Sequence, residues 1–474
     1  MEYEAVIGLE VHLHLKTRTK AFCGCSTEFG NTPNTQACPV CLGFPGSLPV
    51  LNRTALEYAL KVALAFNCQI QEFTKFDRKH YYYPDLPKNY QISQYDLPLS
   101  RNGFLDIKLD GKIKRIGITR AHLEEDAGKL IHAENFTLVD FNRAGIPLLE
   151  IVSDPDINSP QEAYEYLTAL KSTIEYLDVS DCDMEKGSLR CDANISIRPK
   201  GAKELGTKTE LKNMNSFKAV RDALVFEIKR QTGLQDLGQA IVQETRLWDE
   251  KSQQTLAMRS KEEAKDYRYF PDPDLPQFII SKEKIAEIQN TIGELPQEKM
   301  QRFIKDYGLS QYHAKILVDN KEDAAYAEIC LRGYPQKDKK VVTNWLVGPI
   351  AAIASDNAVS ISGLGIEPKD TIELIGFVEN GKISNLVGKS VLAQMAKTHK
   401  SPALIISEQN LVQISDEASL ERDVNLVIQE NPKVVQDYKT GKESSIMFLV
   451  GQVMKKTGGK ANPKVVQEIL KRRL

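Results

Sequence analysis

The sequence lacks the features that mark membrane-spanning, secreted and strongly charged proteins. No stretch reaches 18 consecutive apolar residues, which predicts the absence of a membrane-spanning helix. The first residues, MEYEAVIG, have neither a basic start nor an apolar signal core, so we expect a cytoplasmic protein with no membrane partner. Excess charge of one sign is also missing, because 62 Lys and Arg stand against 64 Asp and Glu. A nucleic acid would therefore have to bind a local patch.

The common nucleotide-binding and nucleophile motifs are missing as well. The nearest approach to a P-loop is Gly388-Lys389-Ser390, but the first glycine of that motif would fall at position 383, which is Ile383. We find no Rossmann glycine fingerprint, no G-x-S-x-G elbow and no cysteine with an evident catalytic partner. Any chemistry must therefore come from another arrangement of side chains.

The most regular stretch that is present is VIGLEVHLHL, residues 6–15. Its odd positions are apolar, whereas Glu10, His12 and His14 occupy even positions, a pattern typical of a half-buried β-strand. Residues two apart on one face lie about 6.5–7 Å from each other, so a carboxylate and two imidazoles stand in one row. Such a row can bind a metal ion or a metal-bound phosphate. A solvated strand at the edge of a sheet is the simpler alternative.

The rest of the first part of the chain mixes helical and strand patterns. Apolar stripes predict helices at 53–67 and after the capping box at Ser159, and alternating runs beside Asn-Gly and Asp-Gly predict hairpins between 102 and 120. The aromatic, proline-broken segment KFDRKHYYYPDLPKNYQISQYDLP matches neither period and is expected to be a functional loop. RCDANISIR is a second alternating strand with a polar face, so we predict an α+β fold whose sheet has one functional face.

Strands become scarce beyond the segment at 293–296, and helical stripes take over. We predict a cradle-like domain with a mixed or antiparallel sheet at 1–292, an all-α domain at 293–405 and a small helical tail at 406–474. The last 44 residues hold ten Lys and Arg against three Asp and Glu. The tail also contains an amphipathic helix, built on Ile446, Leu449, Val450, Val453 and Met454, and the turn TGGKANP. A basic helical tail suggests an RNA-docking module, and a solvated charged surface fits equally well.

Four of the eight cysteines are closely spaced. They form the pairs Cys23-x-Cys25 and Cys38-x2-Cys41, with twelve residues between the pairs. Such pairs are typical of a tetrahedral four-thiolate zinc site, and with four protein ligands the site would be structural rather than catalytic. The alternative is a set of free thiols. The cysteines at 68, 182, 191 and 330 are scattered and are assigned to packing.

A second set of candidate metal ligands is acidic. It comprises Glu10, Glu124, Glu125 and Glu150, with His12 beside them. Several carboxylates that meet in one pocket need a cation to stay ionised, and oxygen ligands favour Mg²⁺ or Mn²⁺. A metal ion there could bind ATP phosphates and stabilise charge on a transferring phosphoryl group. His12 could instead lie outside the coordination shell, and in the simplest alternative these residues never meet.

Seven segments resemble the B subunit of the aspartyl/glutamyl-tRNA amidotransferase, and together they span nearly the whole chain. They are VIGLEVHLHLKT, FDRKHYYYPDLPKNYQISQYD, DFNRAGIPLLEIVSDPD, SDCDMEKGSLRCDANISIRP, GTKTELKNMNSF, DYRYFPDPD and FLVGQVMKKTGGKANP. The resemblance implies a subunit of a carbon–nitrogen ligase that uses ATP to phosphorylate the side-chain carboxylate of Glu-tRNA(Gln) or Asp-tRNA(Asn). Ammonia would then displace the phosphate. It would arrive through a channel from a glutaminase A subunit, and a small C subunit would complete a heterotrimer in which the tail of the present chain binds the outer side of the tRNA.

The resemblance also assigns roles to individual residues. It places magnesium ligands at Glu10, His12, Glu124, Glu125 and Glu150, the set collected above. Lys79 and Lys88 would lie near the ammonia route and the phosphorylation pocket, with ordinary surface lysines as the alternative. Nucleotide or acceptor-end contacts are expected from some of Arg190, Asp192, Asn194, Lys208, Glu210, Lys212 and Asn213. Tyr81, Tyr82, Tyr83 and Tyr90 could stack on the terminal adenosine, although tyrosine clusters also pack.

Two other interpretations compete with this one. A non-catalytic, zinc-containing tRNA-binding scaffold would not need the cluster of glutamates and histidine, so Glu125→Gln would leave its activity intact. A free-standing metal hydrolase would turn over without tRNA or partner subunits. The sequence does not decide between Glu-tRNA(Gln) and Asp-tRNA(Asn) as the substrate.

Overall fold

The computed structural model describes residues 2–258, 267–412, 417–458 and 461–474. The chain forms two compact units, Met1–Leu295 and Pro296–Leu474. The first unit is α+β and the second is helical, which confirms the fold class predicted from the sequence. The division of the helical part near residue 405 stays a prediction. Residues 413–416, next to that boundary, and 459–460, in the predicted tail turn, lie outside the described residues.

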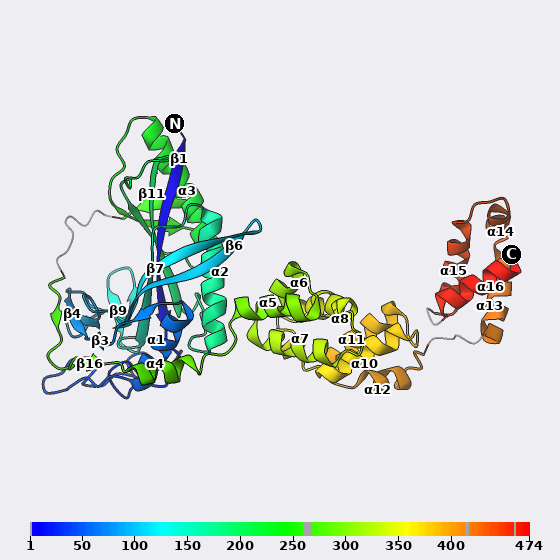
Figure 1. Cartoon of the computed structure of the whole chain (residues 1–474), viewed down its shortest axis with the longest axis horizontal. Coiled ribbons are helices and arrows are strands. Elements are labelled where there is room, and N and C mark those ends of the chain that lie inside the picture. Colours follow the sequence, from blue (N-terminus) through cyan, green and yellow to red (C-terminus); the bar gives the residue numbers. More distant parts are fainter. Residues whose placement is uncertain (1, 259–266, 413–416, 459–460) are drawn as a thin grey trace. The chain divides into compact units, whose positions relative to one another are not determined.

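A nine-stranded sheet forms the centre of the first unit (Figure 1). Its strand order is β14-β13-β12-β11-β1-β10-β7-β6-β2, and the neighbouring strands are antiparallel apart from the parallel pair β12 and β13. The strands are β1 (Tyr3–His14), β2 (Gln69–Ile70), β6 (Ser100–Leu109), β7 (Lys112–Glu125), β10 (Pro147–Ser153), β11 (Leu189–Pro199), β12 (Thr209–Lys212), β13 (Thr245–Asp249) and β14 (Gln254–Ala257). Strand β1 is therefore an interior strand and not the edge strand of the simpler alternative.

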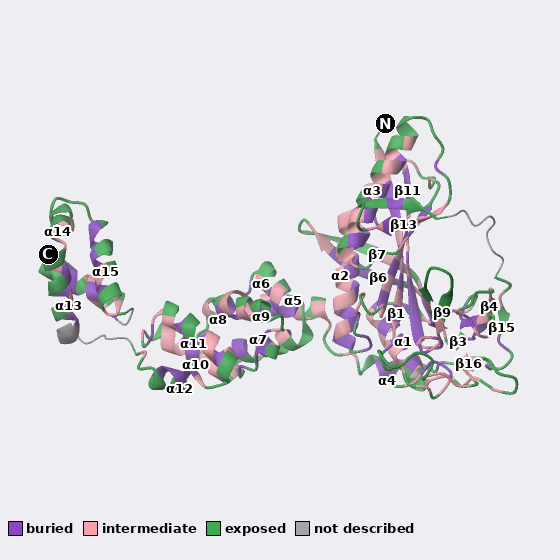
Figure 2. Cartoon of the chain, turned by 180° about the vertical axis from the view of Figure 1, so that it is seen from behind, coloured by how far each residue is buried: buried purple, intermediate pink, exposed green. Residues whose placement is uncertain are grey.

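The apolar face of β1 lies in the core. Ile7, Val11 and Leu13 are fully buried, and helices α1 (Arg53–Ala65), α2 (Pro160–Leu177) and α3 (Phe217–Asp236) contribute to the same hydrophobic cluster. Burying one such side chain stabilises the fold by about 1.5–3 kcal/mol. A register slip of one residue would turn these side chains outward and carry charged groups into the core, so the alternation fixes the register. Figure 2 shows the buried strands of the sheet beside α2.

Small sheets and a hairpin lie on the other side of the central sheet from α2 (Figure 1). Strands β15 (Phe270–Pro271), β4 (Asp77–His80) and β5 (Tyr90–Ser93) form one small sheet. Strands β3 (Phe73–Thr74) and β16 (Phe278–Ile279) form another, and β8 (Lys129–His132) pairs with β9 (Thr137–Asp140). The aromatic segment expected to be an irregular loop thus contains two strands. Each strand has only four residues. In β4 the first residue is buried and in β5 the last three are, so neither strand has the alternation of buried and exposed residues that predicts a strand from sequence.

Only one of the two expected turns in the 102–120 region joins two strands. Asp110 and Gly111, with φ of 50° and 78°, form the two-residue turn between β6 and β7. The Asn102-Gly103 pair instead lies inside β6. Asn102 has a φ of 53°, and the backbone at Gly103 passes directly over Cys68 and Phe66. The glycine is needed for this close approach and not for a turn.

The second unit consists of short helices. They are α5 (Pro296–Tyr307), α6 (Gln311–Val318), α7 (Lys321–Gly333), α8 (Lys340–Trp345), α9 (Ala351–Asp356), α10 (Pro368–Glu379), α11 (Asn385–Thr398), α12 (Pro402–Glu408), α13 (Glu417–Glu430), α14 (Pro432–Lys439), α15 (Ser445–Lys456) and α16 (Pro463–Arg473), while α4 (Lys282–Gln289) belongs to the first unit. The predicted amphipathic tail helix is α15, which buries Ile446, Leu449, Val450 and Val453 in a cluster with α13 and α16.

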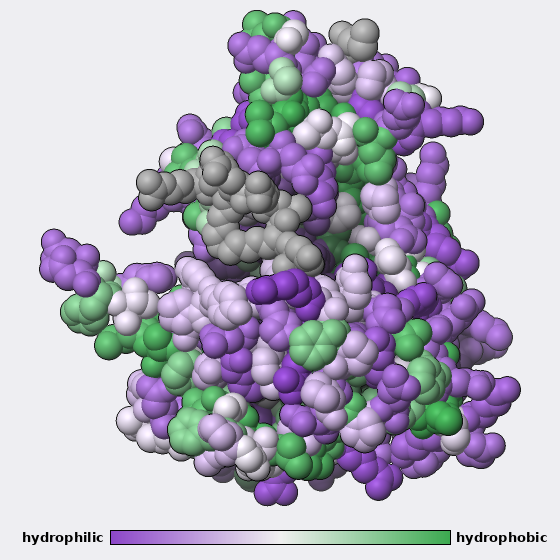
Figure 3. Space-filling model, turned by 90° about the vertical axis from the view of Figure 1, so that its left-hand side faces the viewer, coloured by the Kyte–Doolittle hydropathy of each residue, from purple (hydrophilic) through white to green (hydrophobic). Residues whose placement is uncertain are grey.

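The surface carries polar groups over most of the face in Figure 3, with hydrophobic side chains in small groups between them. Among the described residues, no helix combines the length and the apolar character needed to cross a membrane.

We predict that Gly103→Ala destabilises the first unit by about 1–3 kcal/mol, the usual cost of inserting a methyl group into filled space. An added Cβ would overlap the Cys68 sulfur and lie 2.7 Å from the Phe66 carbonyl oxygen. Urea denaturation of the variant measures the change. Gly293→Ala, where no atom lies within 4 Å of the added Cβ, is the control. Equal denaturation midpoints for both variants would contradict the assigned packing.

Candidate active site

The polar face of the sheet lines up charged residues from four neighbouring strands. His12 on β1 is paired with Glu150 on β10 and with Arg190 on β11, and Glu150 is paired in turn with His122 on β7. Residues directly opposite each other on antiparallel strands have their side chains on the same face. The sheet therefore presents the row Arg190, His12, Glu150 and His122 across four strands.

Two groups of possible metal ligands surround Glu150. In the first, His12 Nε2 lies 3.5 Å from a Glu10 oxygen and 3.4 Å from a Glu150 oxygen. In the second, His122 Nε2 lies 3.1 Å from a Glu124 oxygen and 3.8 Å from a Glu150 oxygen. Within each group of three residues the potential ligand atoms all lie within 4.8 Å of one another. The sheet thus brings together four of the five predicted magnesium ligands.

Burial and mutual charge shift the pKa values of this cluster in opposite directions. Burial, and then the charge of Glu150, raise the pKa of Glu10. Burial alone would lower the pKa of His12, but the hydrogen bond and charge of Glu150 outweigh it and raise that pKa. Burial would likewise raise the pKa of Glu124, but His122 and Lys79 outweigh it and lower the pKa. The carboxylates therefore depend on nearby positive charge to stay ionised.

Glu125, the fifth predicted ligand, has its carboxylate in a different place. It follows Glu124 on β7, so its side chain extends from the other face of the strand. Its oxygens lie 2.5 Å from Lys88 Nζ and accept a 2.9 Å hydrogen bond from the Ile92 backbone N–H. This ion pair lines a cavity of about 290 Å³ together with Lys20 and other residues.

Lys79 stands among tyrosines between the small sheet and the carboxylate cluster. Its ammonium group lies 5.1 Å from the centre of the Tyr267 ring, and it hydrogen-bonds Tyr269. Burial would lower the pKa of Lys79, but Glu124 and other nearby charges raise it. Burial, partly offset by Lys79, raises the pKa of Tyr269 to about 12. Lys79 is therefore held as a cation facing the glutamates.

Two of the four tyrosines predicted to stack on the terminal adenosine, Tyr82 and Tyr90, differ in exposure. Tyr82 is 67% exposed, with Arg268 5.8 Å from its ring centre, and is open to a partner. Tyr90 is half-buried, with the Arg78 guanidinium 4.3 Å and the Lys88 ammonium 5.6 Å from its ring centre. Tyr90 thus already contacts cations of the protein on its ring.

A cavity of about 400 Å³ lies at the N-terminal half of β1. Val6, Gly8 and Glu10 line it from β1, and Asn194 and Lys208, two of the predicted nucleotide contacts, line it from β11 and the following loop. Other parts of the wall are apolar, from Leu205, Val152 and Pro155. Glu10 therefore belongs both to this cavity and to the metal-ligand cluster.

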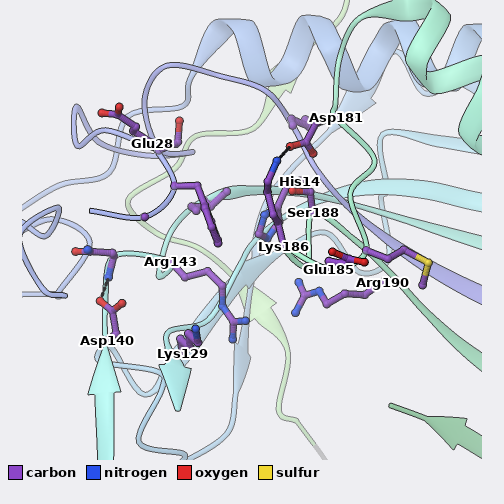
Figure 4. Close-up of a pocket in the computed structure, with 18 of the residues that line it drawn as sticks. His14, Glu28, Lys129, Asp140, Arg143, Asp181, Glu185, Lys186, Ser188 and Arg190 are labelled. Carbon is purple, nitrogen blue, oxygen red and sulfur yellow. Dashed lines mark hydrogen bonds and ion pairs between the residues drawn. The ribbon is translucent and has the colours of Figure 1, made fainter. Parts of the chain in front are cut away.

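A larger cavity of about 810 Å³ lies at the C-terminal end of β1 (Figure 4). Its wall includes five basic residues, Lys16, Lys129, Arg143, Lys186 and Arg190, and five acidic ones, Glu28, Asp140, Asp181, Glu185 and Asp192. Figure 4 shows the side chains of Arg143 and Arg190 extending toward each other. Asn213, another predicted contact, also lines this cavity and donates a 3.1 Å hydrogen bond to the Trp248 carbonyl.

Asp126 holds the two arginines of this cavity. Its carboxylate lies 2.6 Å from His14 Nε2, 2.9 Å from Arg190 and 3.5 Å from Arg143. Burial alone would raise the pKa of Asp126, but the charge of Arg190 and the hydrogen bond from His14 outweigh it and lower the pKa. The buried carboxylate thus fixes the position of cations that line the cavity.

The remaining predicted residues form an ion-pair chain on the same face. Lys212 lies 2.9 Å from Asp192 and 3.1 Å from Glu210. Burial would lower the pKa of Lys212, but these two carboxylates raise it.

The four spaced cysteines come together as the sequence predicts. Their sulfurs lie within 4.8 Å of one another, and those of Cys38 and Cys41 are 3.9 Å apart. Four sulfurs at about 2.3 Å from one zinc ion would lie about 3.8 Å apart, so the group fits this metal. A hydrogen bond from Cys23 lowers the pKa of Cys41 to about 4, and the fully buried Lys20 places its ammonium 3.7 Å from the Cys41 sulfur.

Four residues of the site, His122, Asp126, Arg143 and Tyr269, were not predicted from the sequence. His122 had a signal, because His122-Leu-Glu124 repeats the spacing of Glu10-Val-His12 in reverse and places both side chains on one strand face. Asp126 and Arg143 follow strand ends, where no periodic pattern reports the direction of a side chain. Their pairing depends on a contact between segments far apart in the sequence.

The chain is similar to known proteins over its full length. Residues 5–286 match the family described as "GatB/GatE catalytic domain", and residues 326–474 match the family described as "GatB domain". A relative from Carboxydothermus hydrogenoformans is 55% identical over 478 residues, covering 100% of this chain and 99% of the relative. One from Clostridium botulinum is 51% identical over 471 residues, covering 99% of this chain and 98% of the relative. Both relatives are named as the B subunit of an aspartyl/glutamyl-tRNA(Asn/Gln) amidotransferase.

We predict that Asp126→Asn lowers the free energy of unfolding by about 2 kcal/mol at pH 7, because Arg190, Arg143 and His14 lose their buried counter-charge. The loss is moderate because these three basic side chains are partly exposed to solvent. The pKa of Asp126 is lower in the folded state than in the unfolded state. Its ionised carboxylate therefore contributes fully to the free energy of unfolding above the unfolded pKa of about 3.9, and this contribution is lost as the pH falls below that value.

Urea denaturation at pH 7 and pH 3 measures both effects. The difference in the free energy of unfolding between wild type and Asp126→Asn should be smaller at pH 3 than at pH 7. Asp178→Asn, which alters an exposed ion pair with Lys16, is the matched control and should change stability by under about 1 kcal/mol. A larger difference in the free energy of unfolding at pH 3 than at pH 7 would contradict the assigned ion pairs.

We also predict that the purified chain holds one zinc ion and that Cys41→Ser lowers its zinc affinity at least about tenfold, because a thiolate ligand is lost. Metal analysis after dialysis against a chelator measures this. Cys330→Ser, which changes a buried cysteine of the helical unit, should keep its zinc. Equal zinc content in Cys41→Ser and Cys330→Ser would contradict the assignment of the four cysteines as zinc ligands.

Proposed function

The chain belongs to the family of aspartyl/glutamyl-tRNA(Asn/Gln) amidotransferase B subunits, and we propose that it activates the side-chain carboxylate of Glu-tRNA(Gln), Asp-tRNA(Asn) or both with ATP before amidation. One observation carries the proposal. Along β1 the polar face passes from the 400 Å³ cavity at Val6 to Glu10, through the carboxylate cluster, to the 810 Å³ cavity that begins at His14. A nucleotide, a cation and an acceptor end could thus lie in one line.

The smaller cavity suits the nucleotide. Its apolar wall can receive the base, while Lys208 and Asn194 can contact phosphate and ribose oxygens. From Val6 to Glu10 the strand rises about 13 Å, which is close to the reach from an adenine ring to the terminal phosphates. The γ-phosphate would then lie at the carboxylate cluster.

The larger cavity suits the aminoacylated end of the tRNA. Its cations Arg143, Arg190 and Lys129 can contact backbone phosphates, and Asn213 can hydrogen-bond a base or ribose. His14 and Arg190 lie beside the carboxylate cluster in the same sheet rows. An amino-acid side chain esterified to a terminal adenosine in this cavity could therefore reach the γ-phosphate.

The proposed reaction has two steps that balance in atoms and charge. A carboxylate oxygen of the substrate attacks the γ-phosphorus of ATP, the bond to the bridging oxygen breaks, and ADP leaves with the electron pair. The nitrogen of ammonia then attacks the carbonyl carbon of the acyl phosphate. The carbon–oxygen bond breaks, and hydrogen phosphate leaves with one proton from the nitrogen. An acyl phosphate is needed because a carboxylate is a poor electrophile.

The residues present fit a divalent cation, because carboxylate oxygens and an imidazole nitrogen lie within 4.8 Å of one another in each group of three residues. Bound Mg²⁺ would offset the negative charge of the phosphates as they approach the anionic substrate. Glu10, His12 and Glu150 would hold it. Lys79 would face the transferring phosphoryl group with its ammonium, which the nearby glutamates keep protonated.

Ammonia would approach from the opposite side of β7. The cavity that holds the Lys88–Glu125 ion pair adjoins the cysteine loop, where Gly43 packs against the Lys88 side chain. We infer a glutaminase A subunit and a small C subunit as partners in a heterotrimer, with the zinc loop as a structural element. The basic tail would bind the outer side of the tRNA, and a cytoplasmic location would suit an enzyme of aminoacyl-tRNA.

The test is tRNA-dependent phosphate release by the reconstituted complex. We predict that Glu150→Gln lowers this rate at least about 100-fold, because it removes a charge at the site of phosphoryl transfer, while tRNA binding changes less than about twofold. Glu150 is a sharper probe than Glu125, whose carboxylate is paired with Lys88. Glu287→Gln, at an exposed position of α4, is the control.

Unchanged phosphate release with Glu150→Gln would remove the catalytic assignment and favour a tRNA-binding scaffold. Phosphate release without tRNA or partner subunits would instead favour a free-standing hydrolase.

A further inference from the structure

The segment between the two cysteine pairs, residues 26–37, has no core of its own, and we call it the inter-pair segment. It belongs to residues 15–52, all of which the structure describes and which contain no helix and no strand beyond a single bridge between Thr19 and Ser26. Long loops without regular structure are usually functional or disordered. None of residues 26–37 is buried, so hydrophobic packing does not hold the segment in place.

Two sets of contacts hold the inter-pair segment instead. At its ends lie the four cysteines, whose sulfurs are within 4.8 Å of one another and fit one zinc ion. In its middle, the Asn34 side chain accepts a 2.8 Å hydrogen bond from the Phe141 backbone N–H. The Asn142 side chain donates a 2.8 Å hydrogen bond to the Thr32 carbonyl and accepts one of 2.8 Å from the Gln36 backbone N–H. The segment is therefore positioned by the zinc site and by the loop that follows β9.

A buried lysine joins the cysteines to the same loop. Lys20 is fully buried, and its ammonium lies 3.7 Å from the Cys41 sulfur and donates a 3.1 Å hydrogen bond to the Phe141 carbonyl. A buried cation needs a counter-charge, which zinc-bound thiolates supply. Two residues further along the loop, Arg143 lines the 810 Å³ cavity. The zinc site and this part of the cavity wall are therefore connected.

The inter-pair segment itself forms another part of that wall. Glu28, Phe29, Asn31 and Gln36 all line the 810 Å³ cavity, and Figure 4 shows Glu28 at one side of it and Arg190 at another. Phe29 is 70% exposed, so its ring is open to a ligand in the cavity. One exposed apolar side chain needs no explanation by itself. An open aromatic ring among arginines and lysines, however, is typical of sites for single-stranded nucleic acid.

Two donors in the wall of the cavity have no hydrogen-bond partner among the described residues. They are Gln36 Nε2, in the inter-pair segment, and Arg190 Nε, on β11, and both atoms are buried. A buried donor without a partner is costly, so a ligand that offers acceptors would stabilise both. A nucleic-acid strand has acceptors on its phosphates, its riboses and the edges of its bases. The cavity therefore provides both a ring for stacking and donors for hydrogen bonds.

We propose that the inter-pair segment binds the unpaired 3′ end of the substrate tRNA, and that zinc holds the segment in its binding position. Phe29 stacks on a base of this end, whose faces are free because the end is not part of a duplex. The Gln36 amide donates to an acceptor of the RNA. The identity of the ligand rests on the proposed function, which places the acceptor end in this cavity. Zinc thus supports substrate binding without touching the substrate.

The experiment is a double-mutant cycle that removes the Phe29 ring and the unpaired 3′ nucleotides of the tRNA in turn. The reconstituted, zinc-loaded complex is titrated with intact tRNA and with tRNA that ends at the last base pair of the acceptor stem. We expect Phe29→Leu to weaken binding of intact tRNA at least about fivefold, the lower end of the cost of losing a base stack. Binding of the shortened tRNA should change less than about twofold.

Two control variants accompany this cycle. Phe29→Tyr keeps an aromatic ring and should bind both RNAs like the wild type. Phe73→Leu changes another exposed phenylalanine, on β3, and should also bind both RNAs like the wild type. Because Phe29 is exposed, its substitution leaves the core unchanged, and circular dichroism checks the fold of each variant.

A second cycle tests the role of zinc. Cys25→Ser removes one zinc ligand and should weaken binding of intact tRNA at least about fivefold, because the inter-pair segment is then no longer held. Cys25→Ser and Phe29→Leu together should cost no more than either substitution alone, since a displaced segment cannot present its ring. Phe29→Leu should keep its zinc, which metal analysis measures.

Equal losses for intact and shortened tRNA in Phe29→Leu would overturn the proposal, as would no loss for either. Additive losses in the second cycle would overturn the role of zinc. Both cycles are separate from turnover. A ring-dependent gain from the 3′ end without tRNA-dependent phosphate release would contradict the proposed function and leave this binding element standing, whereas normal release without that gain would do the reverse.

Discussion

The register of β1 between β10 and β11 is the constraint on which the rest of the site depends. Its odd residues fill the core, so its even residues must all face the other way. Pairing then sets His12 opposite Glu150 on one side and Arg190 on the other. The hydrophobic effect is not directional, but by fixing the register of β1 it decides which charged side chains lie opposite each other. The site needs no special backbone conformation, because an ordinary antiparallel ladder places its side chains.

That arrangement also explains why so many ionisable groups can stay buried. Along the sheet rows acids alternate with bases: Lys212 contacts Asp192, Asp126 contacts Arg190 and His14, and His12 lies between Glu10 and Glu150. A buried charge is tolerated when it is paired and hydrogen-bonded. At Glu124 and Glu150 the paired bases are His122, His12 and Arg120, which lies 3.5 Å from Glu150. Three carboxylates, those of Glu10, Glu124 and Glu150, gather around the two histidines at that point of the sheet.

The sequence predicted the features that follow from periodicity and spacing. The alternation of β1, the capping box of α2 and the spacing of the four cysteines each indicated the correct local structure. The α+β class followed from them. The position of Asn102-Gly103 inside β6 was not predictable, because an Asn-Gly pair is typical of a turn and a glycine is also needed where another backbone approaches closely. Nor was the pairing of Asp126 with Arg143 and Arg190 predictable, because Asp126 and Arg143 follow strand ends, where no period reports the direction of a side chain. Only Arg190 lies on a strand whose polar face was predicted.

Glu124 and Glu125 show how adjacent residues can serve two sides of one strand. Glu124 faces the His122 cluster, whereas Glu125 turns to Lys88 and the cavity beside the cysteine loop. Gln91 spans both, since its amide donates to the Glu124 carboxylate and to the Glu125 backbone carbonyl. A shift of Lys88 would therefore act on the end of β7 and, through it, on Glu124. In the proposed reaction, the side that admits ammonia and the side that holds the phosphoryl group are joined by a single peptide bond.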